Sequence, residues 1–310
     1  MDAIALDRVR PRRAAPRWRD DPQALARALL APAILYIGLL VGFPFLLALY
    51  YSVSDATVGA RVFHFVGLEN FRSAIENPTF WQALRNSIVF TVVSQALVVV
   101  LGKAAAMALY RPFRGRALVR FLILLPWVAP ISLGAIGWLW IFDPVYSILD
   151  WVARALHLIG PDAWPIWLGQ PHLAMASVIL VNVWRLAPLA TVIILAGMSA
   201  IPQDIHDAAA IDGAGFWRHL IRINLPLLMP VMLVALLFGV VFTFTDMIVI
   251  FVLTRGGPYD TTQVLASLAF FTGVQGGDLA GGAAIALFLF PVLAAVAIGA
   301  LTLARRAEVV

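Results

Sequence analysis

The sequence predicts an all-α integral membrane protein with six kinked transmembrane helices. Of its 310 residues, 62% are hydrophobic and only 13% are charged, and the mean hydropathy is +0.91. Soluble globular domains hold about 45–50% apolar and about 25% charged residues, so this composition is that of a membrane protein. Cysteine is absent, which excludes a disulfide framework and thiol chemistry.

Six apolar stretches are each long enough to cross a bilayer, whose hydrocarbon core of about 30 Å needs roughly 20 helical residues. Each is apolar on all sides, and most contain a proline, which membrane helices tolerate when neighbouring helices satisfy the freed carbonyls. The first stretch is too long for the apolar region of a cleavable signal peptide. The predicted spans are residues 29–51, 86–110, 117–142, 172–200, 225–253 and 280–304.

Basic residues concentrate in alternate connections, which by the positive-inside rule are cytoplasmic. Both termini are then cytoplasmic, and this topology accounts for the net charge of +5 without a nucleic-acid partner. The Arg/Pro-rich residues 8–19 predict a disordered arm beside anionic lipid. The basic residues are Arg8, Arg10, Arg12, Arg13, Arg17, Arg19, Arg111, Arg114, Arg116, Arg120, Arg218, Arg222, Arg305 and Arg306.

This topology divides the chain into a basic tail, a membrane domain and a short C-terminus. The tail covers residues 1–28, the membrane domain 29–306 and the cytoplasmic C-terminus 307–310. The outer loops are expected at residues 52–85, 143–171 and 254–279.

Two of the outer loops contain predicted helices. Asn77 and Pro78 suit the cap and first position of a short outer helix that leads into the second span. Residues 145–159 carry apolar side chains at helical spacing, but the run is too short to cross a bilayer. This segment either lies along the outer membrane interface or packs against its own subunit, and hydropathy does not separate the two.

Residues 202–224, which we call the elbow, interrupt the apolar pattern between the fourth and fifth spans. Alanine-rich residues around 208–210 favour a helix, and Gly213 favours its end, because glycine adopts the left-handed conformation that closes helices. A second helix is predicted from Phe216 to Asn224, ending before Pro226. From these features alone, an ordinary loop with capped helices is an equal alternative to a functional elbow.

The elbow resembles the cytoplasmic motif of the permease subunits of binding-protein-dependent ABC importers. That motif runs EAA, three residues, G, nine residues, I, one residue, LP. The family usually has Glu where Asp207 stands and Phe where Leu220 stands, so the docking strength is open. The matching residues are Asp207, Ala208, Ala209, Asp212, Gly213, Ala214, Ile223, Leu225 and Pro226.

Flanking stretches resemble the carbohydrate-uptake branch of these importers, in particular its maltose- or glycerol-3-phosphate-type first permease subunit. They are GLENF (67–71), NSIVFT (86–91), FLILLPWVAP (121–130), VWRLAPL (183–189), AGMSAIPQDIHDAAAIDGAG (196–215) and LTRGGP (253–258).

The resemblance implies the type I permease fold, with a cytoplasmic coupling helix, in a prokaryotic inner membrane. It also implies a second related permease, a pair of ATPase subunits, an extracytoplasmic solute-binding protein and a carbohydrate substrate. The elbow would dock on the ATPase, with Asp207 paired to a basic group there. ATP hydrolysis would belong to that other polypeptide, and this chain has no G-x-x-x-x-G-K-[ST] loop. No cofactor, metal site or catalytic residue is expected here.

Ionisable residues inside membrane spans are costly and usually face the bundle interior. Lys103 lies late in the second span, where snorkelling to the headgroups explains it. Arg185 and Asp246 either form a buried ion pair between the fourth and fifth spans or line a substrate path. Because sugars need hydrogen bonds and flat apolar faces, the candidate path comprises Asn182, Trp184, Arg185, Phe242, Phe244 and Asp246.

Tryptophans of the third span, Trp127, Trp138 and Trp140, either add faces to this path or anchor the membrane interface. Two alternative functions remain open. In an ion-coupled secondary transporter, Asp246 would be the coupling carboxylate. In an ABC permease for a glycerol phosphate ester, Arg185 would bind the phosphate.

A membrane enzyme is disfavoured, since no catalytic histidine or serine motif is present and His206 and His219 are expected to be surface groups.

Overall fold

A computed structural model describes residues 22–307, and side chains up to residue 303. The arginine-rich arm predicted at residues 8–19 lies outside the described residues. Within the described part the regular elements are helices, with one isolated antiparallel bridge between Ser54 and Phe65. The chain divides into two compact units, residues 1–50 and 51–310, each of which is described by itself.

The first unit is dominated by one long helix. It comprises α1 (Pro22–Ile37), a π-helical turn η1 (Gly38–Gly42) and α2 (Phe43–Ser52). These 31 residues are long enough to cross a membrane, and an 18-residue stretch within them has a mean hydropathy of 2.2. Within the described residues the helix already includes Pro22, seven residues before the predicted start at residue 29.

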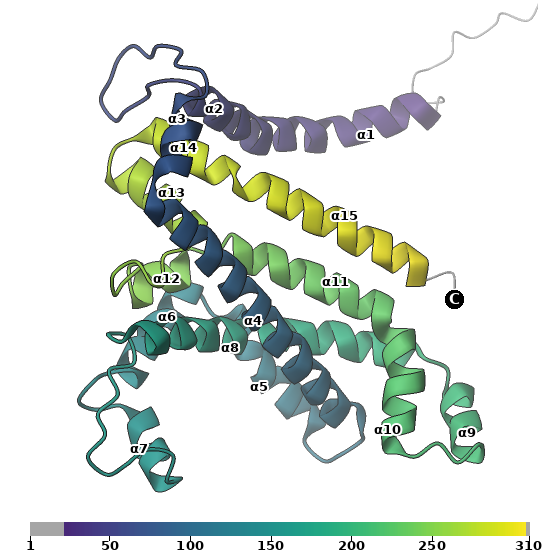
Figure 1. The fold of residues 1–310 in the computed structure, drawn as a ribbon. Helices are drawn as coiled ribbons and strands as arrows, with labels where there is room; N and C mark the ends of the chain where they lie inside the picture. Colours follow the sequence, from purple (N-terminus) through teal and green to yellow (C-terminus); the bar gives the residue numbers. More distant parts are fainter. Residues whose placement is uncertain (1–21, 308–310) are drawn as a thin grey trace, which may run out of the picture. The chain divides into compact units, whose positions relative to one another are not determined.

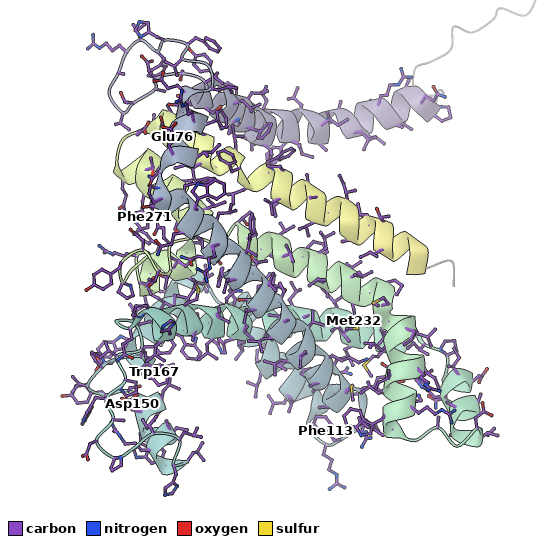
Figure 2. All side chains as sticks on the ribbon, in the orientation of Figure 1. Glu76, Phe113, Asp150, Trp167, Met232 and Phe271 are labelled. Atoms are coloured by element: carbon purple, nitrogen blue, oxygen red, sulfur yellow. The ribbon has the colours of Figure 1, made fainter. Side chains whose placement is uncertain are left out.

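Four long helices form the body of the second unit (Figure 1). They are α4 (Pro78–Tyr110), α8 (Pro171–Ala200), α11 (Leu225–Phe244) and α15 (Leu289–Ala307). Helices α4, α8 and α11 pack against one another, and α15 packs on α11. Met232 belongs to the side chains that fill the space among them (Figure 2). The largest buried cluster includes Phe90, Val98, Phe142, Val178, Leu186, Val249, Ile250 and Val264.

Glycines allow the closest of these helix contacts. A Cβ atom added at Gly102 of α4 would lie 2.9 Å from the Ala190 Cβ of α8. One added at Gly197 of α8 would lie 2.9 Å from a Val231 side-chain carbon of α11. Small residues at helix crossings let backbones approach closely, which is a common source of packing energy between membrane helices.

The second span is longer than predicted. Asn77 caps its start as expected, since Asn77 Oδ1 accepts a hydrogen bond from the Thr79 N–H at 2.9 Å. The short outer helix predicted here is not a separate element, because α4 continues unbroken for 33 residues. The separate helix that precedes it is α3 (Glu69–Glu76).

The third predicted span, 117–142, is broken into two helices. Helices α5 (Arg116–Val128) and α6 (Ile131–Ile141) meet at an angle of 96°. Ala129 between them is extended, with ψ 142°, because the ring of Pro130 disfavours a helical conformation in the residue before it. Among the described residues five helices can cross a membrane alone, and the number becomes six if this bent pair forms one span.

The fifth span also differs from the prediction. A continuous 29-residue helix runs from Phe216 to Phe244, through α10 (Phe216–His219), the π-helical turn η2 (Leu220–Asn224) and α11. The predicted end before Pro226 is therefore wrong. The Leu225 N–H donates to the carbonyl of Leu220, five residues back, and this wider turn accommodates a proline that a regular helix turn would exclude. The helix stops at Phe244, and α12 (Ile248–Leu253) is separate.

The two ends of the second unit differ (Figure 1). At one end, which we call the elbow end, α4 and α8 finish and α9 (Gln203–Ile211) and α10 project. The opposite end carries α3, α12 and α7 (Ile148–Ala155), which is shorter than the predicted 145–159. The last elements are α13 (Leu265–Phe270), η3 (Phe271–Gln275) and α14 (Leu279–Leu287), which leads into α15.

Candidate functional site

The elbow bends where the sequence predicts. Helix α9 ends at Ile211, and Gly213 has a left-handed φ of +68°. The Ala214 N–H donates to the Ala209 carbonyl at 2.9 Å, and the Gly213 N–H donates to the Ala210 carbonyl at 3.1 Å. These two bonds form the Schellman closure of a helix. A Cβ atom at Gly213 would meet nothing within 4 Å, so there is space for a side chain. Glycine is favoured there by the backbone conformation alone, because a residue with a Cβ atom would pay about 1–2 kcal/mol for the left-handed φ.

The elbow exposes large apolar side chains. Ile211 is 87% exposed and Trp217 is 70% exposed, and Phe216 and Ile221 are also exposed. An exposed cluster of this kind marks a surface that contacts another protein or a membrane. Its polar neighbours Asp207, Asp212, Arg218 and Arg222 are exposed as well.

Two histidines connect the arms of the elbow. His206 Nδ1 of α9 lies 2.9 Å from His219 Nε2 of α10, and both side chains are half-buried. The expectation that they are surface groups is only partly met, because the Gly213 turn folds α10 back beside α9 and leaves both rings half-buried. A cavity of about 610 Å³ is lined by this pair and by Tyr110 and Arg111 at the end of α4.

A buried lysine connects the base of the elbow to α4. Lys103 is 8% exposed and Asn224 is 5% exposed, and Lys103 Nζ donates a hydrogen bond to Asn224 Oδ1. The expected snorkelling of Lys103 to the headgroups is wrong, because η2 covers it. The motif residues Ile223, Leu225 and Pro226 belong to this base, in η2 and the first turn of α11, and not to the tip.

A second polar cluster joins α4, α8, α11 and the start of α12. Arg185 Nη2 lies 2.6 Å from Asp246 Oδ2, and it also donates to Asn182 Oδ1 at 3.2 Å. Asn182 Nδ2 donates to Thr243 Oγ1 at 3.0 Å, and Gln95 Nε2 donates to the same oxygen at 2.7 Å. Of the two interpretations of the sequence, the geometry realises the ion pair.

This polar cluster is enclosed by the protein. Asn182 and Thr243 have no exposed surface, and Asp246 is 7% exposed. Asp246 lies in the break between α11 and α12, where its Oδ1 accepts a hydrogen bond from the Val249 N–H at 3.0 Å. Gln95 packs against Gly239, where an added Cβ atom would lie within 1.9 Å of Gln95 Oε1. The charged groups are thus committed to contacts within the chain.

Aromatic rings lie near this cluster and remain partly open. Trp184 is 36% exposed and Phe242 is 39% exposed. The Trp127 ring stands edge-on to Phe242 at 5.4 Å, and Trp138 stands edge-on to Trp184 at 5.7 Å. Trp184 also lies against Gly134 of α6, where a Cβ atom would be 3.3 Å from the ring. We call Trp127, Trp138, Trp184 and Phe242 the aromatic wall.

Two other predicted aromatic residues lie elsewhere. Phe244 is only 3% exposed and lines an apolar groove of about 650 Å³ between α4, α11 and α15, so it is not grouped with the other candidates. Phe242 and Phe244 point to different sides because α11 turns by about 200° over two residues. Trp140 is 77% exposed at the end of α6.

Sequence reasoning missed Gln95, Asn224 and Gly134 as members of these sites. Gln95 and Asn224 are polar residues beside or within apolar runs, which is a detectable pattern, since buried polar groups need partners. No sequence pattern marks Gly134. Its need for a missing side chain becomes visible only when the structure places the Trp184 ring against it.

The fold is that of a multi-pass helical membrane protein. The chain superposes on a chain of the crystal structure of a bacterial alginate ABC transporter in complex with an alginate pentasaccharide-bound periplasmic protein, with a TM-score of 0.79. The superposition covers 93% of this chain and 97% of that chain at 20% identity, which shows the shared fold.

Residues 98–308 match the family model described as binding-protein-dependent transport system inner membrane component, and the chain belongs to this family. It is 35% identical over 227 residues to the trehalose/maltose transport system permease protein MalF of Thermococcus litoralis, covering 73% of this chain and 75% of the relative. It is 30% identical to the sulfoquinovosyl glycerol transport system permease protein SmoG of Agrobacterium fabrum, over 88% of both chains. The family assigned from the sequence is therefore confirmed.

Proposed function

We propose that this chain is one permease subunit of an ATP-driven, binding-protein-dependent importer for a carbohydrate. It forms half of the translocation path with a second, related permease, and its elbow docks on a pair of ATPase subunits. The elbow end then faces the cytoplasm, as do both termini, and a solute-binding protein delivers substrate at the opposite end. The arginines at 111–120 and 218–222 support this orientation by the positive-inside rule.

The observation that carries the proposal is the construction of the elbow. Its closure at Gly213 turns two short helices side by side, and Ile211 and Trp217 stand exposed near the turn. The second of these helices continues without a break into α11. A movement of a protein bound at the tip is therefore transmitted to the membrane helices through a continuous backbone.

The carbohydrate assignment is supported by the relatives and by the aromatic wall. The relatives are named for trehalose, maltose and sulfoquinovosyl glycerol transport. Partly open rings at Trp184 and Phe242, with Trp127 beside them, offer flat apolar faces of the kind that pyranose rings stack on. The break between α5 and α6 lies next to this wall, and discontinuous helices often mark substrate sites in transporters.

The polar cluster argues against the two alternative functions. The Asp246 carboxylate is occupied by Arg185 and by the Val249 N–H, so it is not free to bind a coupling ion. The charge of Arg185 is balanced by the same carboxylate, which leaves no excess positive charge for a phosphate ester. In the proposed function Asn182, Arg185 and Asp246 hold α8, α11 and α12 together beside the path.

The decisive experiment compares two glycines of the elbow in a reconstituted transporter. The chain is assembled with its partner permease, ATPase and solute-binding protein in proteoliposomes, and uptake of a labelled sugar is measured. Gly213→Val should abolish uptake while the complex still inserts, because valine disfavours φ +68°. Gly215→Val is the matched control, because Gly215 has φ −65° and open space around it, and uptake should persist.

If the Gly213→Val variant takes up sugar at the wild-type rate, the proposal that the elbow docks on the ATPase is refuted. Uptake that persists with an inactivated ATPase would replace this proposal by a secondary transporter. The substrate itself is best identified by measuring which sugars bind the partner solute-binding protein, because that protein selects the cargo before it reaches this chain.

A further inference from the structure

The loop between α6 and α8, at the end opposite the elbow, carries a surface to which the proposed function assigns no role. It contains α7, whose exposed positions are mostly large and apolar. Tyr146 is 84% exposed, Leu158 73%, Trp151 65% and Trp164 61%. The other exposed apolar members are Val145, Ile148, Val152, Leu156 and Ile166. We call these nine residues the α7 surface.

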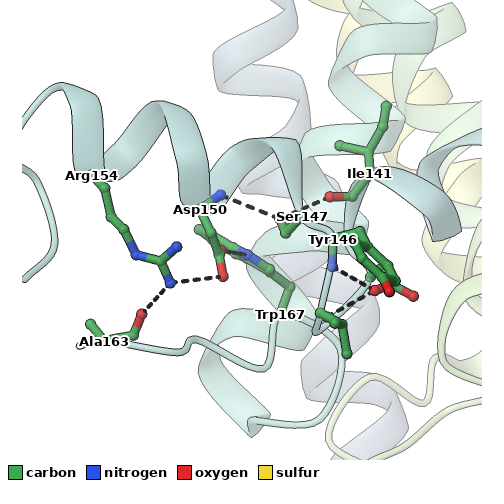
Figure 3. A network of polar contacts seen from close by, with 9 residues as sticks. Ile141, Tyr146, Ser147, Asp150, Arg154, Ala163 and Trp167 are labelled. Carbon is green, nitrogen blue, oxygen red and sulfur yellow. Dashed lines mark hydrogen bonds and ion pairs between the residues drawn. The ribbon is translucent and has the colours of Figure 1, made fainter. Parts of the chain in front are cut away.

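Two charged residues of α7, Asp150 and Arg154, are turned inward. Asp150 is 3% exposed and accepts a hydrogen bond from Trp167 Nε1 at 2.6 Å (Figure 3). Arg154 Nη2 donates to the Ala163 carbonyl at 2.8 Å and lies 3.9 Å from Asp150 Oδ2. The Arg154 guanidinium also lies 4.5 Å from the centre of the Trp164 ring. An acid and a base thus neutralise each other beneath the α7 surface.

Further hydrogen bonds fix α7 to the end of α6. Ser147 Oγ donates to the Ile141 carbonyl at 2.9 Å and accepts from the Asp150 N–H at 3.3 Å (Figure 3). Asp143 Oδ1 accepts from the N–H groups of Val145 and Tyr146, each at 2.8 Å. The exposed side chains therefore project from a backbone that is held in place by polar contacts.

The position of the loop sets the medium around it. Helix α6 ends at Ile141 and α8 begins at Pro171, so α7 lies at the level where two membrane helices end. In Figure 1 the loop extends sideways from that end of α8, on the side away from α11 and α15. Because α7 extends away from the helix bundle at the level where the membrane helices end, its apolar surface reaches the boundary between lipid headgroups and acyl chains.

We propose that the α7 surface lies in the interfacial layer of the bilayer, on the face opposite the elbow, with Trp151 and Trp164 at headgroup level. Tryptophan and tyrosine are enriched at this depth, because their rings are apolar and their N–H or O–H groups stay hydrated. Amphipathic helices bury their apolar face there. Because Asp150 and Arg154 pair within the loop, neither of these two charges enters the interface unpaired.

The absence of cysteine in the chain makes a direct test simple. A single nitroxide label is attached at Trp151→Cys in the full chain, reconstituted in phosphatidylcholine nanodiscs. Its collision rates with oxygen, which concentrates in lipid, and with a water-soluble nickel chelate are measured by electron paramagnetic resonance. Asp162→Cys, an exposed acidic position of the same loop, is the aqueous control.

The label at residue 151 should collide more with oxygen than with the chelate, and the label at residue 162 should show the reverse order. Equal access of the chelate to both labels would overturn the proposal. Protection of residue 151 from both reagents would also overturn it, because a protein surface would then cover α7. Leu158→Cys, beyond the end of α7, repeats the test with a variant that leaves the helix unaltered.

Discussion

The ion pair between Arg185 and Asp246 allows a sharp test of how the buried polar cluster is stabilised. Asp246→Asn removes the negative charge but keeps an Oδ1 acceptor for the Val249 N–H. The paired atoms are 2.6 Å apart, and the Arg185 and Asp246 side chains are 14% and 4% exposed, so water does not replace the lost partner. Removing one member of such a buried pair costs about 3–5 kcal/mol.

The double variant Arg185→Met with Asp246→Asn should regain most of this loss, because it leaves no isolated buried charge. The assay is thermal unfolding of the purified chain in nanodiscs, followed by loss of the monodisperse peak in size-exclusion chromatography. At about 2 °C per kcal/mol for a chain of this size, the single variant should unfold roughly 6–10 °C below the parent.

Asp212→Asn, at an exposed position of the elbow, controls for the loss of a carboxylate and should leave the unfolding temperature unchanged. The reasoning fails if Asp246→Asn unfolds at the temperature of the parent. It also fails if the double variant is no more stable than Asp246→Asn, because the cost would then come from lost packing or hydrogen bonds and not from an unpaired charge.

Three further predictions concern the elbow and the helix contacts. Asn224→Leu leaves the buried Lys103 ammonium without its acceptor, so it should lower the stability of the fold by about 1–3 kcal/mol. Its unfolding temperature should fall further than that of Lys103→Met, which removes the charge itself, and an equal fall in both variants would contradict this. Gly102→Leu overpacks the contact with α8 and should cost about 1–3 kcal/mol or more, whereas Gly299→Leu, in open space, should be neutral. His206→Phe should speed amide hydrogen exchange throughout α9 in mass spectrometry, and unchanged exchange would show that the histidine contact does not hold the arms together.

Local chemistry explains what the sequence predicts correctly. The number and approximate places of the apolar stretches follow from hydropathy, because a membrane helix needs a minimum apolar length. The turn at Gly213 is predictable because a left-handed helix closure depends on a few neighbouring residues. The cap at Asn77 is predictable for the same reason.

Prolines show where local reasoning ends. Pro130 breaks the third span by 96°, whereas α8 continues through Pro188 and the helix from Phe216 continues through Pro226. All three segments are apolar and contain proline, so composition does not separate them. The difference lies in the surroundings, because Pro188 is buried among packed helices and a π-helical turn precedes Pro226.

Long-range contacts were accessible only in part. Two opposite charges in apolar spans indicate a partner, and Arg185 with Asp246 follows from that requirement. The contact of Lys103 with Asn224 joins residues 121 positions apart, and nothing in either neighbourhood indicates the other. Only the folded chain brings the two residues together.

The unbroken helix from Phe216 to Phe244 has a mechanical consequence. At 1.5 Å per residue the 20 residues of its longest part, α11, span roughly 30 Å, with the base of the elbow at one end and Thr243 of the polar cluster at the other. A rotation of α11 by about 5° around one end displaces its other end by roughly 3 Å, which is about half of one helix turn. Small angular changes at the tip are thereby amplified into shifts that are large enough to separate or join side chains across the bundle.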